Sequence, residues 1–373
     1  MKVEVNKKRK SNIELLRIIA MLLIVSYHVI LHLDINTSTI ANNSNIILIN
    51  ILMFNGKFGV NLFMLISGYF LINAKFKLKN LLKLFLNTSI CTIVILTSLF
   101  FLKVPIGIID CVKNIFPVFF NVYWFITTYF IIYLLINYIN YFLQKLPQKK
   151  YFILLIILGV VLSVLPSLFH ITMINENNFV WLVYLYFIGA YIKLYIPIKN
   201  KSIKYIFIGV FIYTLGILSA FVFQYLGTKY SIFLEQQFYF AKQFSVFLLM
   251  ASIFIFFGFL GINIKTSSKI NSIASCMIGV YLIHDNYLLR KYLYFDVFQN
   301  DLFVNSPKFG LKIFLTIMIL FLGSIIITLI YKRTIGKYID RGSQRLEEKI
   351  IKSKALKNIS SKFNIICNLE EIR

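Results

Sequence analysis

Charged residues, and acidic ones above all, are scarce in this chain. Only 14% of its 373 residues are charged while 59% are hydrophobic, and the mean hydropathy is +0.79. Soluble globular domains carry about 25% charged residues, so the composition excludes an ordinary soluble protein. Hydrophobic runs recur along the chain, and we predict an all-α polytopic membrane protein.

Basic residues greatly outnumber the acidic ones. Lys and Arg total 39 against 14 Asp and Glu, which gives a formal net charge of +25. Such an excess can indicate nucleic-acid binding. Here the basic residues fall between the hydrophobic runs and at both ends, where the positive-inside rule places them. We therefore predict no nucleic-acid partner and interpret the charge as a signal of membrane orientation.

Cysteine is also rare, and its positions exclude two kinds of site. The four cysteines form no CxxC pair and have no metal-ligand spacing, and both Cys91 and Cys276 fall inside hydrophobic segments. Disulfide frameworks and zinc sites need such residues at regular, short spacings. We predict neither.

Processing signals and internal repeats are lacking as well. The start, MKVEVNKKRKSN, is basic and precedes an apolar run, but no small-residue cleavage site follows, so we predict a retained first span. We expect a basic cytoplasmic N-terminus at 1–12, a transmembrane domain at 13–331 and a basic cytoplasmic tail at 332–373, with no appended extracytoplasmic domain. The tail is expected to lie along the anionic inner leaflet.

Ten helices of about 20 apolar residues each would account for the hydrophobic runs. The predicted spans are 13–33, 58–74, 84–102, 121–142, 151–169, 179–196, 205–226, 243–262, 272–289 and 310–331. Most Lys and Arg then lie on one side, which places both termini in the cytoplasm. Segment 43–57 is apolar but interrupted by Asn50, Asn55 and Gly56. We expect it to be interfacial or re-entrant, because an eleventh span would invert the downstream charge asymmetry.

Two ionisable residues in the first span are the strongest functional signal. Arg17 and His28 are eleven residues apart, which is three helical turns, so both side chains share one face, roughly 16 Å apart along the axis. An ionisable group inside a bilayer costs about 3 kcal/mol or more unless it faces a cavity or a partner. We predict a functional pair. The structural alternatives are a snorkelling Arg17 and a His28 that hydrogen-bonds a neighbouring helix.

Neighbouring residues could support this pair. Glu14 precedes Arg17 by one turn and can pair with its guanidinium, whose fork also suits a phosphate or carboxylate. His28 can act as a general base or a nucleophile. His32 follows at i+4, and an HxxxH pair can bind metal, but no third ligand can be assigned, so we predict no metal.

Other candidates have ordinary structural explanations beside the functional ones. Ser67 is one of several small residues, with Gly59 and Gly68, that allow close helix approach, and Trp124 fits an aromatic belt at the outer boundary. His284 and Asp285 form either a structural or a functional pair. A cluster of lysines after the second span fits a positive-inside loop: Lys75, Lys77, Lys79 and Lys83.

Four segments in this order resemble the acyltransferase family 3 membrane proteins: IELLRIIAMLLIVSYH, FGVNLFMLISGYFL, YWFITTYFIIYLL and IGVYLIHDN. The first two are specific in combination. The resemblance implies a bundle of about ten helices in a bacterial plasma membrane that takes an acetyl group from cytoplasmic acetyl-CoA. The acceptor would be a hydroxyl of an extracytoplasmic or lipid-linked envelope glycan.

The resemblance also implies roles for individual residues. His28 would be the catalytic base or a transient acyl carrier, and Arg17 would help to hold the donor. Glu14 stands where the family commonly has an acidic residue. Where the family often has closely spaced arginines, this chain offers Lys75, Lys77 and Lys79 for donor binding; lysine neutralises phosphates as a point charge but lacks the bidentate fork.

We therefore predict an O-acetyltransferase acting on a capsule, exopolysaccharide or related envelope glycan. The alternatives are a lipid-linked oligosaccharide flippase or transporter, a glycan polymerase, and a relative that uses another acyl donor. Transporters tend to show repeated halves and helices broken at the midplane, and the sequence indicates neither. A polymerase would be expected to have a large outside loop, whereas the predicted outside loops are modest.

Overall fold

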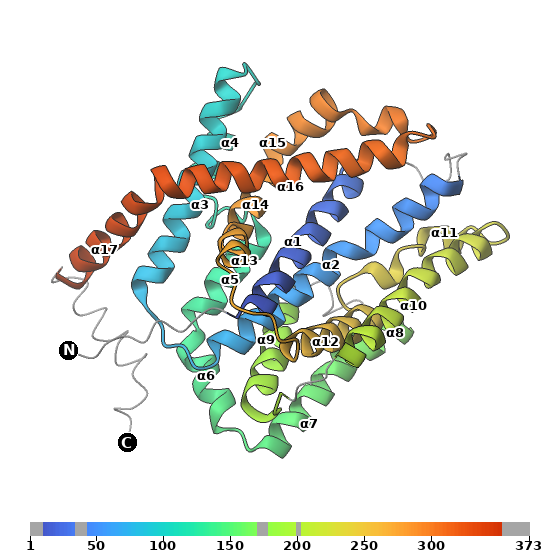
Figure 1. The fold of residues 1–373 in the computed structure, drawn as a ribbon, viewed down its shortest axis with the longest axis horizontal. Coiled ribbons are helices and arrows are strands. Elements are labelled where there is room, and N and C mark those ends of the chain that lie inside the picture. The colour runs from blue at the N-terminus through green and yellow to red at the C-terminus, as the bar shows by residue number, and fades with distance from the viewer. Residues whose placement is uncertain (1–9, 34–42, 170–177, 199–202, 353–373) are drawn as a thin grey trace.

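Helices of Leu, Ile and Phe form the framework, because in a bilayer each backbone N–H and C=O must find its partner within the chain. The computed structural model describes residues 10–33, 43–169, 178–198 and 203–352, and in these ranges every regular element is a helix. Long helices pack side by side in one bundle (Figure 1). The predicted all-α polytopic architecture is confirmed.

Eight segments of the described chain are long and apolar enough to cross a membrane. They are α1 (Ser11–Leu31), α2 (Asn43–Leu71), α3 (Leu78–Phe101), α7 to α8 (Gln148–Phe169), α9 (Asn178–Tyr195), α10 (Ile203–Gly227), the stretch ending in α12 (Ile232–Leu260) and α16 (Phe309–Thr334). α5 (Trp124–Leu134) and α6 (Ile136–Lys145) meet at a 63° bend, so this pair is either a broken ninth span or a re-entrant loop.

The expectation of an interfacial or re-entrant piece at 43–57 is wrong. This segment is the first half of α2, one continuous helix of 29 residues. Its asparagines do not break the helix because they are satisfied inside the bundle. Asn50 accepts a hydrogen bond from Gln237 at 2.7 Å, and Asn55 donates to Ser26 at 2.7 Å. The extra turns lengthen the second span and leave the downstream orientation unchanged.

The predicted span 272–289 is not one helix. It consists of α13 (Ser268–Ala274), α14 (Met277–His284) and α15 (Tyr287–Lys291). The last break has a local cause: the Asn286 side chain accepts hydrogen bonds from the backbone of Leu288 and Leu289, which starts a new helix. The chain still passes through the bundle here, since the backbone of Ser267 bonds Ser11 at one end of α1 and His284 reaches His28 near the other.

The two ends of α1 define two ends of the bundle, which we call the Arg17 end and the His28 end. The C-terminal part of α16 lies at the Arg17 end, because Lys332 bonds Ser275 just after α13 at 2.8 Å and Ser11 bonds Asn271 of α13 at 3.1 Å. At the His28 end lie α4 (Ile108–Ile115), α15 and the π-helix Tyr292–Phe298.

The tail begins as a further helix, α17 (Gly336–Lys352), which packs on the first half of α3 (Figure 1). Lys83 of α3 pairs with Asp340 at 2.5 Å, and the backbone N–H of Lys79 donates to Glu347 at 3.0 Å. The rest of the predicted tail, 353–373, lies outside the described residues, as do residues 1–9 of the predicted N-terminal segment 1–12.

Small residues allow α2 and α9 to cross closely. A Cβ at Gly68 would lie 2.2 Å from the carbonyl oxygen of Tyr186, and one at Gly189 would lie 2.2 Å from that of Leu65. Only glycine fits both positions. This contact holds α2 in place beside α1, and so fixes one wall of the cavity described next.

Candidate active site

A cavity of about 730 Å³ runs along α1 between the two ends of the bundle. We call it the main cavity; its walls come from α1, α2, α3, α5, α14 and α16. On α1 it is lined by a stripe at three- and four-residue spacing, Arg17, Met21, Ile24, His28 and Leu31, with Tyr27 beside it. Arg17 and His28 therefore face the same space from opposite ends.

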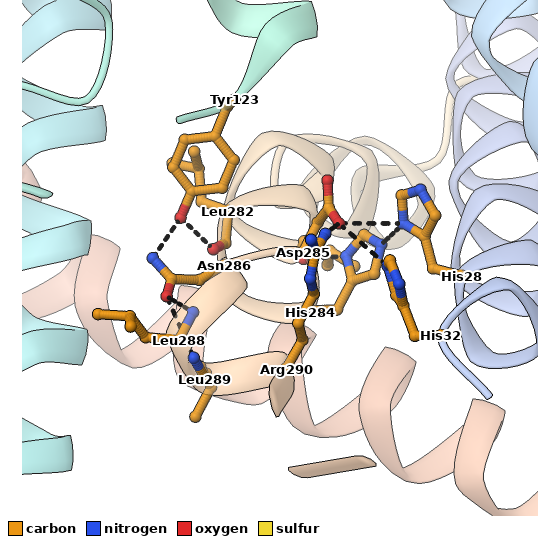
Figure 2. A network of polar contacts seen from close by, with 11 residues as sticks. His28, His32, Tyr123, Leu282, His284, Asp285, Asn286, Leu288, Leu289 and Arg290 are labelled. Carbon is orange, nitrogen blue, oxygen red and sulfur yellow. Dashed lines mark hydrogen bonds and ion pairs between the residues drawn. The ribbon is translucent and has the colours of Figure 1, made fainter. Parts of the chain in front are cut away.

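His28 is held by a second histidine from α14. Its Nδ1 lies 2.9 Å from Nε2 of His284, and Nδ1 of His284 lies 2.7 Å from the carbonyl oxygen of Val280. A carbonyl can only accept, so Nδ1 of His284 carries the proton. With both rings neutral, Nε2 of His284 accepts from Nδ1 of His28. The lone pair of His28 is then on Nε2, and Figure 2 shows that one ring nitrogen of His28 points away from this network.

A buried carboxylate faces the two rings. Oδ1 of Asp285 lies 3.6 Å from Nδ1 of His28 and 3.7 Å from Nε2 of His32, and it accepts a hydrogen bond from Arg290 at 2.9 Å (Figure 2). The Asp285 side chain is only 9% exposed. A carboxylate at this position stabilises positive charge on His28 when its Nε2 takes up a proton.

The next residue braces this arrangement against α5. Asn286 is fully buried and donates to the hydroxyl of Tyr123 and to Oδ1 of Asn114, each at 3.0 Å. Tyr123, directly before α5, donates in turn to the carbonyl of Leu282 at 2.7 Å (Figure 2). The YWF and HDN segments of the sequence are therefore in direct contact, and together they fix the position of Asp285.

The Arg17 end of the main cavity is cationic. Arg17 donates from Nη1 to the buried carboxylate of Glu14 at 2.6 Å, while its side chain is still 26% exposed. Lys83 and Lys332 line the cavity near it, and the cavity lining contains no acidic residue among the described part of the chain. An anionic group that approaches from this end meets net positive potential.

The remaining predicted site residues divide between this cavity and the surface. Ser67 and Trp124 line the cavity, and Ser67 also donates to the carbonyl of Phe63 at 2.9 Å. His32 joins the Asp285 network. Lys75 and Lys77 are exposed between α2 and α3, and Lys79 lies against α17; these three lysines do not line the main cavity.

Some residues of the site were not singled out from the sequence. Arg290 pairs with Asp285, and Tyr27, Lys57, Lys83 and Lys332 line the main cavity. Lys57 was missed because segment 43–57 was expected to be interfacial or re-entrant; a lone cation inside a membrane helix is a functional candidate by default. Lys83 was counted with its lysine neighbours as an orientation signal.

Within the described ranges, no group of three His, Cys, Asp or Glu side chains is arranged to hold a metal ion. The histidines that lie together are otherwise engaged. His284 uses Nδ1 for a backbone carbonyl and Nε2 for His28, while Asp285 is paired with Arg290.

A membrane bundle that encloses a base and a carboxylate at one end of a cavity, and a group of cations at the other, has the layout of a membrane-embedded group-transfer enzyme. A family model described as an acyltransferase domain matches residues 10–333. The chain belongs to this family, acyltransferase family 3, and is a membrane acyltransferase. No curated protein and no solved structure matches the chain.

Proposed function

We propose that this protein transfers an acetyl group from acetyl-CoA, bound at the Arg17 end, to a hydroxyl of an envelope glycan at the His28 end. The observation that supports this most is the main cavity itself. It joins an anion-attracting mouth to an imidazole whose Nε2 is free to take a proton. The Arg17 end would face the cytoplasm of a bacterial plasma membrane, with both termini on that side.

The donor would bind with its phosphates on the cations and its thioester inside the bundle. Arg17, Lys83 and Lys332 would hold the phosphates, and Lys75, Lys77 and Lys79 on the nearby surface would add attraction over a distance. The pantetheine arm is long and thin, and the path from Arg17 to His28 is roughly 16 Å. A polar nucleotide could therefore stay at the inner face while its acetyl group reaches His28.

His28 would act as the general base. Its Nε2 takes the proton of the acceptor hydroxyl while that oxygen attacks the thioester carbonyl. The new C–O bond forms, the C–S bond breaks, and the proton on His28 passes to the departing CoA thiolate. Asp285 stabilises the imidazolium that exists between these proton transfers. His32 and His284 hold the His28 ring and the Asp285 carboxylate in their relative positions.

The experiment is the O-acetyl content of surface polysaccharide, measured by proton NMR. A deletion strain is complemented with either the wild-type chain or His28→Asn, and membrane levels of both are matched by immunoblot. Acetyl signals restored only by the wild type would support the proposal and identify the modified sugar. Unchanged acetylation with a collapse in polysaccharide amount or chain length would instead favour a lipid-linked oligosaccharide flippase or a polymerase.

A further inference from the structure

A second cavity adjoins the main one near His28. It has a volume of about 360 Å³ and lies between α2, the start of α9 and the segment 238–244 before α12. Tyr27 and Lys57 line both cavities. The two spaces therefore meet at these two side chains, and Tyr27 directly precedes His28, with its ring centroid 5.4 Å from that of the imidazole.

The contact between α1 and α2 sets this junction. A Cβ at Gly56 would lie 2.2 Å from the Tyr27 ring, so only glycine lets the ring pack against α2 at this point. Lys57 follows at once in the sequence and projects its Nζ 4.7 Å from the centroid of the Trp124 ring, inside the main cavity. A cation and two aromatic rings thus line the main cavity together with His28, and one of the rings, Tyr27, contacts His28.

The second cavity carries a further lysine at its other side. Lys242 lines it, with Nζ 5.6 Å from the centroid of the Tyr239 ring. Neither Lys57 nor Lys242 pairs with a carboxylate in the described part of the chain, and no described acidic residue lines the second cavity. Aromatic faces offset only part of the cost of such a charge. The positive potential in this low-dielectric space favours an anionic ligand.

We infer that the second cavity is the acceptor site and that it selects an acidic glycan, whose carboxylate or phosphate binds Lys57 and Lys242. This inference rests on the proposed function. An anionic group held there would place a neighbouring hydroxyl at the junction with the main cavity, beside His28. Donor and acceptor would then approach the base through separate openings.

The test uses purified protein in lipid nanodiscs, radiolabelled acetyl-CoA, and de-O-acetylated surface polysaccharide from the deletion strain. The polysaccharide is supplied in three forms: untreated, with carboxylates reduced to alcohols, and with phosphates removed by hydrofluoric acid. The variants are Lys57→Gln, Lys242→Gln and Lys57→Arg. Lys229→Gln is the matched control, because Lys229 lies similarly over a tyrosine ring, 5.9 Å from the Tyr225 centroid, but lines neither cavity.

With the untreated acceptor we expect each Gln variant to raise the acceptor KM about tenfold, since a hydrogen bond to a charged group is worth about that factor or more. Lys57→Arg should retain most of the affinity. One of the two treated forms should raise the wild-type KM to a similar extent and identify the anion. On that form the Gln variants should show little further loss, because the interaction is already gone.

Two results separate the inference from the proposed function. The acidic-acceptor inference would be overturned if Lys57→Gln raised the acceptor KM equally for charged and uncharged acceptors. It would also be overturned if neither treatment changed the wild-type KM. In both cases transfer would still require His28. No transfer to any form by the wild type, or transfer that survives His28→Asn, would overturn the proposed function and the inference with it.

Discussion

The two ends of the main cavity are built on opposite principles. At the His28 end, polar side chains are buried and joined to one another: His284 and Asn286 are fully buried, and Asp285 is in contact range of two histidines and Arg290. At the Arg17 end, the cations are partly exposed, and Lys83 is 46% exposed even where it pairs with Asp340.

Under the proposed function, the difference corresponds to two different tasks. Proton transfer needs groups held in a fixed geometry in a dry site, where electrostatic interactions are strong. Capture of a soluble, highly charged donor needs positive potential and access, and is served by flexible cations at a wet mouth. Substitutions should therefore act on kcat at the His28 end and on the donor KM at the Arg17 end.

Asp285→Asn tests the His28 end and should have the largest effect. The amide keeps the shape but cannot stabilise an imidazolium, so we expect kcat to fall about 100-fold or more. Acetyl transfer in nanodiscs measures it. The control is Asp110→Asn, which removes a carboxylate bonded to Tyr287 at 2.7 Å outside the main cavity. A near-normal kcat for Asp285→Asn would show that this carboxylate has no role in the mechanism.

Arg17→Lys should act mainly on the KM for the donor. Lysine keeps the charge but loses the fork that can bind Glu14 and an anion together. We expect the KM for acetyl-CoA to rise about tenfold, with a smaller change in kcat. Arg333→Lys, at the end of α16 and outside the cavity lining, is the control. An unchanged donor KM would count against a donor role for Arg17.

Substitutions of the lysines near the Arg17 end should change the donor KM by amounts that depend on whether the lysine lines the main cavity. Lys83→Gln removes a cation that lines the main cavity, and we expect a rise of about three- to fivefold in donor KM that shrinks at high salt. Lys77→Gln removes an exposed charge outside the cavity and should change KM by less than about twofold. Equal effects of the two changes would mean that only the summed charge of this surface matters.

A small effect in the opposite direction is expected from α17, the helix that packs against this region. Asp340→Asn breaks the exposed pair between α17 and Lys83. Exposed pairs contribute little stability, but the change frees Lys83 for the donor. We expect the donor KM to fall about twofold, and this gain should vanish in combination with Lys83→Gln. A rise in KM would show that α17 supports the mouth instead of competing for it.

Hydrophobic runs were sufficient to predict most helices, and polar residues inside them caused the errors. Asn50 and Asn55 suggested a break in the second span, yet partners on α1 and in the segment between α10 and α12 satisfy them. The opposite error occurred at 272–289, where an apolar run concealed the cap made by Asn286. For Asn50 and Asn55 the deciding partners are remote in sequence, whereas the partners of the Asn286 cap are two and three residues away.

The sequence by itself determined the membrane class, most of the apolar helices and the alignment of Arg17 with His28, because these follow from composition and from the 3.6-residue period of a helix. Only the tertiary structure decided that His284 and Asp285 face His28, that Arg290 pairs with Asp285, and that Lys57 lines two cavities. These side chains come from segments up to about 260 residues apart. Local periodicity does not show which helices meet. Packing, and the need to satisfy each buried polar group, decide this.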